Sequence, residues 1–368
     1  MNSRRWHWLV ALAGIVLLPG VVVSAEAATD AYQKGEVCLE KGEFDSAITA
    51  FTDAIRLSPK SAEAYYSRGR AYGGKGDFDK AIADFTKAIR LDPKLAAAYS
   101  CRGFAYRLKG DFDKAIADYS EAIRLTPKDA KAWCSRGTAR KGKGDLDHAI
   151  ADYDEAIRLK PEYAEAWCLR GIVYWTRTDL DKAATDYTEA IRLDPRLADA
   201  YYNRGNVYLK KRDLDKAIAD YTAAVRLTPK DAEVYYNRGT AYCGRGDDDK
   251  ANADFTEAIR LKPKWADAYF NRGMTYWKKG DFDKVIADFT QGIRLNPRSA
   301  EAYCTRGSAY GNKGEHDKAI ADFTEAIRLD PGYAPAYYCR GLAREKRGEK
   351  SQAEEDFAQA RKLGYRRK

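Results

Sequence analysis

The chain has 368 residues, of which 45% are hydrophobic and 32% charged, and its formal net charge is +9. Its three histidines and seven cysteines are scattered, which argues against a metal centre, and the sequence contains no nucleophile elbow, phosphate-binding loop or isolated pair of carboxylates. The sequence therefore gives no support to an enzyme or a metalloprotein, and we expect no catalytic residue, cofactor or metal.

The first 27 residues differ from the rest of the chain. Arg4 and Arg5 precede an apolar run over residues 8–18, and residues 25–27, Ala-Glu-Ala, offer a cleavage site. This layout is typical of a secretory signal peptide, so we expect export to the periplasm or secretion. The alternative is an uncleaved anchor in the inner membrane over residues 8–23, because such a segment approaches the length that spans a bilayer.

From residue 28 onward the sequence repeats every 34 residues. Nine prolines stand 34 residues apart, and we number the repeat so that this proline occupies position 32. A fixed period of this size is the signature of a repeat array. The ten repeats are 28–61, 62–95, 96–129, 130–163, 164–197, 198–231, 232–265, 266–299, 300–333 and 334–367, and the last lacks the proline.

Each repeat carries two helical patterns. Position 8 is glycine and position 24 is Phe or Tyr in all ten repeats, and alanine fills positions 20 and 27 in nine repeats each. Positions 4, 8 and 11 recur at helical spacing, as do positions 17, 20, 21, 24, 27 and 28, which predicts two amphipathic helices per repeat. Glycine at position 15 ends the first helix, an acid at position 16 caps the second, and proline stops it. Helices this short are marginal alone, so stability must come from stacked neighbours.

This pattern resembles the tetratricopeptide repeat family, and the resemblance covers residues 28–367. It implies an all-α fold, a right-handed superhelical solenoid of stacked helix-turn-helix repeats that binds other proteins. We therefore expect a non-enzymatic scaffold or adaptor that holds a partner peptide or protein in the concave groove of the superhelix.

A second function stays open, because position 14 is Lys or Arg in all ten repeats. Such a basic row could bind an anionic polymer, either nucleic acid or an envelope glycan. Acidic and basic residues alternate along the helices, however, which is more typical of a solvated surface, so this pattern argues against nucleic acid as a partner.

A second stripe on the first helix, at positions 2, 5, 9 and 12, lies away from the packed stripe at positions 4, 8 and 11. The resemblance implies that it lines the groove. In repeats 5 to 8 it is unusually apolar, which indicates an interaction surface, and asparagines at positions 6 and 9 could bond an extended peptide. The candidate partner-binding residues are Ile172, Trp175, Tyr202, Asn203, Asn206, Leu209, Tyr236, Asn237, Phe270, Asn271, Met274 and Trp277. The alternative is that they pack against neighbouring helices.

The charges along this stripe predict what kind of peptide would bind. Some relatives hold a carboxylate with basic residues at position 2, but repeats 6 to 8 carry Asp199, Glu233 and Asp267 there. We therefore expect a ligand with basic and apolar residues. The stripe of repeats 2 and 3 is more polar, with Arg70 and Arg107.

Position 7 is arginine and position 23 aspartate in repeats 2 to 10, beginning with Arg68 and Asp84. We predict an ion pair between the two helices of each repeat, and a partly exposed pair contributes only about 0.2–1 kcal/mol. The alternative is two independent surface preferences.

Two repeats depart from the pattern. Asp248 and Asn252 replace apolar residues in repeat 7, which predicts the least stable interior joint. Lys350, Glu354 and Arg361 give repeat 10 a polar face, which is typical of a terminal repeat. We expect all seven cysteines to be free thiols, because packed helices lie too far apart for most disulfides.

Overall fold

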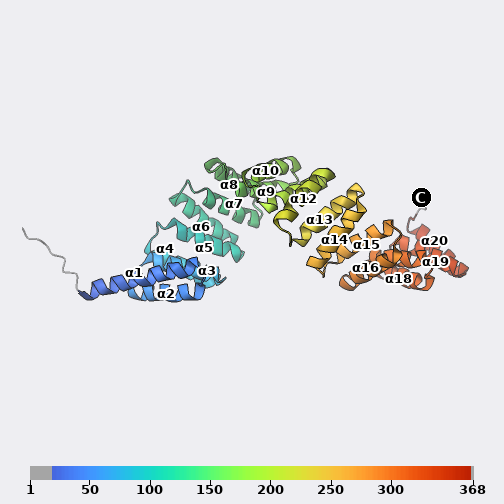
Figure 1. Cartoon of the computed structure of the whole chain (residues 1–368), viewed down its shortest axis with the longest axis horizontal. Helices are drawn as coiled ribbons and strands as arrows, with labels where there is room; N and C mark the ends of the chain where they lie inside the picture. Colours follow the sequence, from blue (N-terminus) through green and yellow to red (C-terminus); the bar gives the residue numbers. More distant parts are fainter. Residues whose placement is uncertain (1–18, 366–368) are drawn as a thin grey trace, which may run out of the picture. The chain divides into compact units, whose positions relative to one another are not determined.

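The computed structural model describes residues 19–365, and these residues form helices and no strand (Figure 1). The predicted all-α class is confirmed. The described helices are α1 Pro19–Glu40, α2 Phe44–Leu57, α3 Ala62–Gly74, α4 Phe78–Leu91, α5 Ala96–Leu108, α6 Phe112–Leu125, α7 Ala130–Lys143, α8 Leu146–Leu159, α9 Ala164–Thr176, α10 Leu180–Leu193, α11 Ala198–Lys210, α12 Leu214–Leu227, α13 Ala232–Arg245, α14 Asp248–Leu261, α15 Ala266–Lys278, α16 Phe282–Leu295, α17 Ala300–Asn312, α18 His316–Leu329, α19 Ala334–Lys346 and α20 Lys350–Lys362.

The helices are paired as the repeat predicts. In repeats 2 to 10 the first helix begins at position 1 and the second at position 17. The chain divides into two compact units between Val173 and Tyr174, which we call the N-terminal and C-terminal units. Within each unit, the two helices of a repeat pack against one another and against the next repeat (Figure 1).

The first helix extends further upstream than the repeat does. Helix α1 begins at Pro19 and so includes residues that the sequence assigns to the leader. Residues 1–18, which hold most of the predicted signal peptide or anchor, lie outside the described residues. No helix in the described part of the chain has both the length and the apolar character needed to cross a bilayer.

The turn between the two helices follows the predicted chemistry in repeat 2, whereas the acid at position 16 makes no side-chain cap at Glu43, Asp145, Asp247, Glu315 or Glu349. Gly76 adopts a φ of 81°, a left-handed conformation that glycine takes without a steric cost. The Asp77 side chain then accepts a hydrogen bond from the backbone N–H of Lys80 and caps α4. Thr178 and Arg212 adopt the same positive φ without a glycine.

Small residues on the first helix make room for the aromatic ring of the second. A Cβ added at Gly69 would lie 2.7 Å from the ring of Phe85, which is itself 3% exposed. Ala81 and Ala88, at positions 20 and 27, are completely buried on either side of that ring. The same arrangement of glycine and aromatic ring recurs in both units, and it brings the two helices of a repeat close together.

The predicted ion pair is present and more buried than expected. Arg204 donates from Nε and Nη2 to the two carboxylate oxygens of Asp220, each at 2.8 Å, and from Nη1 to Thr188 of the preceding repeat at 3.0 Å. The pair recurs as Arg68–Asp84, Arg102–Asp118, Arg136–Asp152, Arg238–Asp254, Arg272–Asp288, Arg306–Asp322 and Arg340–Asp356. The assumption of partly exposed pairs was wrong, because these aspartates are only 1–7% exposed. The arginine therefore joins both helices of its repeat to the repeat before it.

The polar residues of repeat 7 have polar partners in repeat 8. Asn252 donates to Thr275 Oγ1 at 2.8 Å, and Asp248 lies 2.7 Å from Lys278 Nζ. The expectation that this joint is the weakest stays a prediction, but its polar groups are satisfied. In repeat 10, Lys350, Glu354 and Arg361 are exposed, as their polarity predicts. All seven cysteines are free thiols, as predicted.

Candidate functional site

The structure places the predicted partner-binding residues on the first helices of their repeats. Ile172 and Trp175 lie on α9, although Ile172 belongs to the N-terminal unit and Trp175 to the C-terminal unit. The others lie on α11 (Tyr202, Asn203, Asn206, Leu209), α13 (Tyr236, Asn237) and α15 (Phe270, Asn271, Met274, Trp277). Met274 is 43% exposed, and the rest of the set is half-buried.

Hydrogen bonds between adjacent first helices use the amides of this surface. Asn237 Nδ2 donates to the Tyr202 hydroxyl at 3.1 Å and to Asn206 Oδ1 at 3.2 Å, and Asn271 Nδ2 donates to the Tyr236 hydroxyl at 2.8 Å. Both N–H groups of the Asn237 side chain are thus engaged within the protein. This favours the alternative that these asparagines join the repeats.

Several aromatic side chains of the set also pack within their own unit. The ring centroids of Tyr236 and Trp265 lie 4.4 Å apart, and those of Phe270 and Phe289 lie 5.2 Å apart. The rings of Trp277 and Phe282 pack edge to face, with 5.4 Å between their centroids. The side chains of this surface that are exposed, and not half-buried, are Met274 and the acids Asp199, Glu233 and Asp267.

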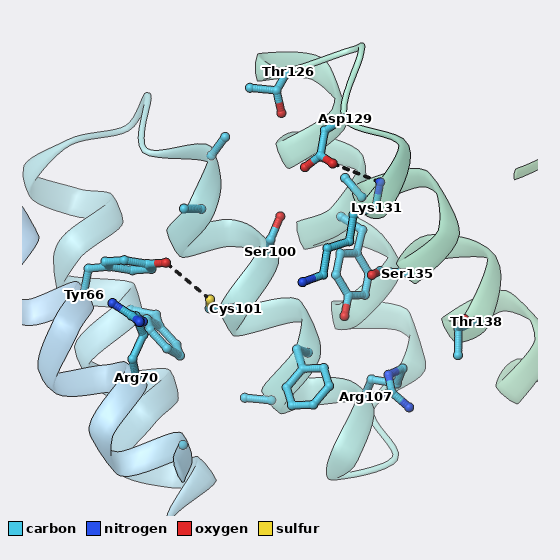
Figure 2. A pocket seen from close by; sticks show the side chains of 18 of the residues that line it. Tyr66, Arg70, Ser100, Cys101, Arg107, Thr126, Asp129, Lys131, Ser135 and Thr138 are labelled. Atoms are coloured by element: carbon cyan, nitrogen blue, oxygen red, sulfur yellow. Dashed lines mark hydrogen bonds between the residues drawn. The ribbon is translucent and has the colours of Figure 1, made fainter. Parts of the chain in front are cut away.

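The N-terminal unit contains a cavity of about 870 Å³ that the sequence analysis did not identify (Figure 2). The side chains that line it come mainly from three successive first helices, α3, α5 and α7. Many belong to the stripe that the sequence predicted to line the groove, including Arg70, Phe104 and Arg107. We call this the α3–α5–α7 cavity.

Basic side chains surround this cavity. Figure 2 shows Arg70 on α3, Arg107 at the end of α5, and Lys131 extending from α7 toward α5. Arg70 Nη1 lies 3.5 Å from Glu36 Oε2, whereas among the described residues no carboxylate lies within ion-pair distance of Arg107 or Lys131. The Arg107 guanidinium lies 5.0 Å from the centre of the Phe104 ring. The cavity therefore presents positive charge that the protein does not neutralise.

Two further groups influence the charge of the cavity. Burial lowers the pKa of Lys141, and the nearby Arg107 lowers it further. Asp129 is the carboxylate on the cavity wall, and its Oδ1 accepts the backbone N–H of Lys131 at 2.9 Å, which caps α7 (Figure 2). One negative group that is already hydrogen-bonded thus faces several cations.

A buried hydroxyl in the cavity wall lacks a partner. Tyr119 is 2% exposed, and its hydroxyl makes no hydrogen bond to any described residue. Burial raises the pKa of Tyr119 to about 12, although the nearby Arg107 and Ser135 act to lower it, so the hydroxyl is neutral at physiological pH and able to donate. The α3–α5–α7 cavity thus combines cations, an unused hydroxyl and the exposed ring of Phe104.

The absence of a partner for Tyr119 has a cause in the sequence. The equivalent Tyr153 and Tyr221 bond the side chains at position 9 of their own repeats, Thr138 at 3.2 Å and Asn206 at 2.7 Å. In repeat 3 that position is Phe104, which is 49% exposed and offers no acceptor. The pairing of phenylalanine at position 9 with tyrosine at position 24 was the signal that could have located the cavity.

Within residues 19–365 no group of three or more His, Cys, Asp or Glu side chains could hold a metal ion. The expectation that the protein needs no cofactor stays a prediction.

Comparison with known families gives matches along the array. Models described as tetratricopeptide repeat match residues 32–96, 168–232, 202–266, 85–117, 266–299 and 300–333, and a model described as TPR repeat matches residues 105–144 and 139–176. The last two tetratricopeptide matches coincide with repeats 8 and 9. No curated protein sequence matches the chain.

Two solved structures show the same architecture, and a third resembles part of the chain. A tetratricopeptide repeat protein from Parabacteroides merdae is 20% identical, with a TM-score of 0.53, over 68% of this chain and 99% of that one. PilF from Pseudomonas aeruginosa is 19% identical, with a TM-score of 0.50, over 55% of this chain and 92% of that one. YrrB, a TPR protein with an unusual peptide-binding site, is 26% identical, with a TM-score of 0.40, over 49% of this chain and 93% of that one. The first two likenesses concern the fold alone.

Proposed function

Since the chain belongs to the tetratricopeptide-repeat family, we propose that it is a non-enzymatic scaffold that holds a segment of a partner protein against its first helices. The α3–α5–α7 cavity carries this proposal, because it opens along the stripe of positions that the repeat leaves outside its packed core. Its volume of about 870 Å³ lies within the range of sites that enclose small ligands or short chain segments.

Site-specific photo-crosslinking of the full-length chain in cells tests this proposal. A photoreactive residue replaces Phe104 on the stripe or, as a matched control, Ala83, which is exposed on the second helix α4. We expect a defined partner polypeptide to be joined at position 104 and not at position 83. Equal yields at both positions would contradict the proposed binding face.

In the C-terminal unit we propose that the surface around Met274 takes a peptide with basic and apolar residues. The exposed thioether of Met274 offers an adaptable apolar contact, and the exposed acids at position 2 of repeats 6 to 8 complement a cationic ligand. A peptide array tests this: cationic apolar peptides should bind better than anionic ones, and Met274→Ala or Trp277→Ala should weaken them. Preference for anionic peptides that persists in Met274→Ala would overturn it.

Binding of an anionic polymer is the less supported function. The basic residues of position 14, on which it rests, pair with aspartates of the preceding repeat, as Lys211 Nζ does with Asp181 Oδ1 at 2.6 Å. The same pairing joins Lys75–Asp45, Lys109–Asp79, Lys143–Asp113, Arg245–Asp215, Lys279–Asp249, Lys313–Asp283 and Arg347–Asp317. The row is thus largely neutralised. Nucleic-acid affinity that falls steeply with salt would revive this function.

We also propose that the protein is exported, because the residues before the array have the layout of a signal peptide. Fractionation with N-terminal sequencing tests this. Cleavage after residue 27 or nearby, in a soluble envelope fraction, would support it. An intact N-terminus in the inner membrane would favour the anchor instead, and an intact N-terminus in the cytoplasm would contradict both.

A further inference from the structure

We propose that the α3–α5–α7 cavity binds an acidic peptide segment, in which carboxylate and bulky apolar side chains alternate. Tyr119, Arg107 and Lys131 would receive a carboxylate, and Phe104 would contact the apolar side chain. This inference rests on the proposed scaffold function and deepens it, because it assigns to the N-terminal unit a ligand charge opposite to that proposed for the surface around Met274.

The buried hydroxyl of Tyr119 has no hydrogen-bond partner among the described residues. A buried polar group without a partner costs about 1–3 kcal/mol, and repeats 4 and 6 avoid that cost by placing an acceptor at position 9. Repeat 3 has Phe104 there and leaves the hydroxyl unbonded. A ligand oxygen within the cavity would accept a hydrogen bond from this hydroxyl.

The cavity also carries positive charge that no carboxylate within residues 19–365 neutralises. Arg107 and Lys131 have no carboxylate partner among the described residues, and the lowered pKa of Lys141 has both burial and Arg107 among its causes. Asp129 is the acid on the wall, and it already accepts the N–H of Lys131. A carboxylate is the complementary ligand, because cations that lack a protein partner gain most from an incoming anion.

Exposed apolar side chains on α5 favour a peptide over a free anion as the ligand. Phe104 is 49% exposed, and Leu108, one turn further along α5, is 45% exposed. A small anion would leave both side chains in water, whereas a peptide with apolar residues would cover them. Arg70, Arg107 and Lys131 also lie on three different helices, so an extended segment with more than one acid fits them better than a single anion does.

Fluorescence anisotropy with the full-length chain tests the inference. The probe is a labelled peptide of alternating Glu and Leu, blocked at both ends, and its matched partners carry Gln or Lys in place of Glu. We expect the Glu peptide to bind roughly tenfold or more tightly than the Gln peptide. Tyr119→Phe and Arg107→Gln should each weaken the Glu peptide by about three- to tenfold, since each removes a bond to a charged group.

Two further variants provide controls. Tyr221→Phe removes the equivalent hydroxyl of repeat 6, which is already bonded to Asn206, and should leave the affinity unchanged. Phe104→Asn places in repeat 3 the acceptor that repeat 6 has, so it should raise the thermal midpoint and weaken the Glu peptide. A rise in stability together with weaker binding cannot come from misfolding.

The outcomes separate this inference from the function on which it rests. Equal affinity for the Glu and Gln peptides, or an equal effect of Tyr119→Phe and Tyr221→Phe, would overturn the acidic ligand. If Phe104→Asn still weakened the binding of the Glu and Gln peptides, the scaffold function would survive. Failure of all three peptides to bind would overturn the acidic ligand, and the crosslinking at position 104 would then decide the scaffold function separately.

Discussion

Two glycines on α3 lie one turn apart and have different surroundings. A Cβ at Gly69 would meet the Phe85 ring at 2.7 Å, whereas a Cβ at Gly73 would meet nothing within 4 Å. We predict that Gly69→Ala destabilises the protein by about 1–3 kcal/mol through overpacking. Gly73→Ala, the matched control, should stabilise it by about 0.5–1 kcal/mol, because alanine is the better helix former. Urea midpoints check both values, and equal effects of the two changes would contradict this account.

In repeats 2 to 4 and 6 to 10 the arginine at position 7 and the aspartate at position 23 form a buried bidentate pair. We predict that Asp220→Asn destabilises by about 3–5 kcal/mol, because it leaves the guanidinium of Arg204 without its counter-charge in a site where Asp220 is only 6% exposed. A double-mutant cycle with Arg204→Gln should give a coupling of about 0.5–3 kcal/mol. Asp199→Asn, an exposed acid on α11, is the control and should change stability little. A coupling of zero would mean that Arg204 and Asp220 contribute independently to the free energy of unfolding.

At the scale of the element, the joint between α14 and α15 depends on a polar pair. Asn252 donates to Thr275, a residue with no exposed surface, and accepts from the Tyr276 hydroxyl at 3.3 Å. We predict that Asn252→Ile, which restores the usual residue of position 21, destabilises by about 1–3 kcal/mol because it removes the donor to the buried Thr275 hydroxyl and the acceptor of the Tyr276 hydroxyl.

The double variant Asn252→Ile with Thr275→Val should recover much of that loss, because valine also occupies the equivalent position in α9 and α11, as Val173 and Val207. Chemical denaturation of the two variants and of Thr275→Val alone distinguishes this from simple additivity. If the double variant were less stable than the sum of the two single effects predicts, the polar pair would not be what determines the stability of this joint.

For the whole molecule, the buried tyrosines predict sensitivity to alkali. Burial raises the pKa of Tyr119 and of Tyr333 to about 12, and it raises the pKa values of Tyr66, Tyr153, Tyr163 and Tyr221 as well. A folded-state pKa above the unfolded value of about 10 favours the neutral form, so stability is complete below pH 10 and is lost as the pH rises toward the folded pKa values.

We therefore expect the urea midpoint to hold up to about pH 9.5 and to fall steadily above it, with tyrosinate absorbance appearing together with unfolding. Tyr119→Phe should reduce the fall by a small but measurable share, because one raised pKa is removed. A midpoint that stays constant to pH 11 would contradict the burial of these hydroxyls.

The candidate site shows where inference from the sequence stops. Asn237 stands at a position suited to bind a peptide, yet its amide is engaged by Tyr202 and Asn206. Phe104 was one apolar residue in a stripe interpreted as polar, and its importance comes from the hydroxyl of Tyr119 on another helix. Both outcomes depend on which side chains meet between helices, and the spacing of residues along one helix does not specify that.

The helix pairs, their turns and the glycine beneath each aromatic ring follow from the sequence alone, because each depends on contacts within one 34-residue period. The pairing of arginine with aspartate was also predictable, but its burial was not. Only the tertiary structure decided which part of the first-helix stripe stays open. In repeats 6 to 8 the aromatic and amide groups satisfy one another, whereas around α5 two cations have no carboxylate partner among the described residues and a buried hydroxyl has no hydrogen-bond partner.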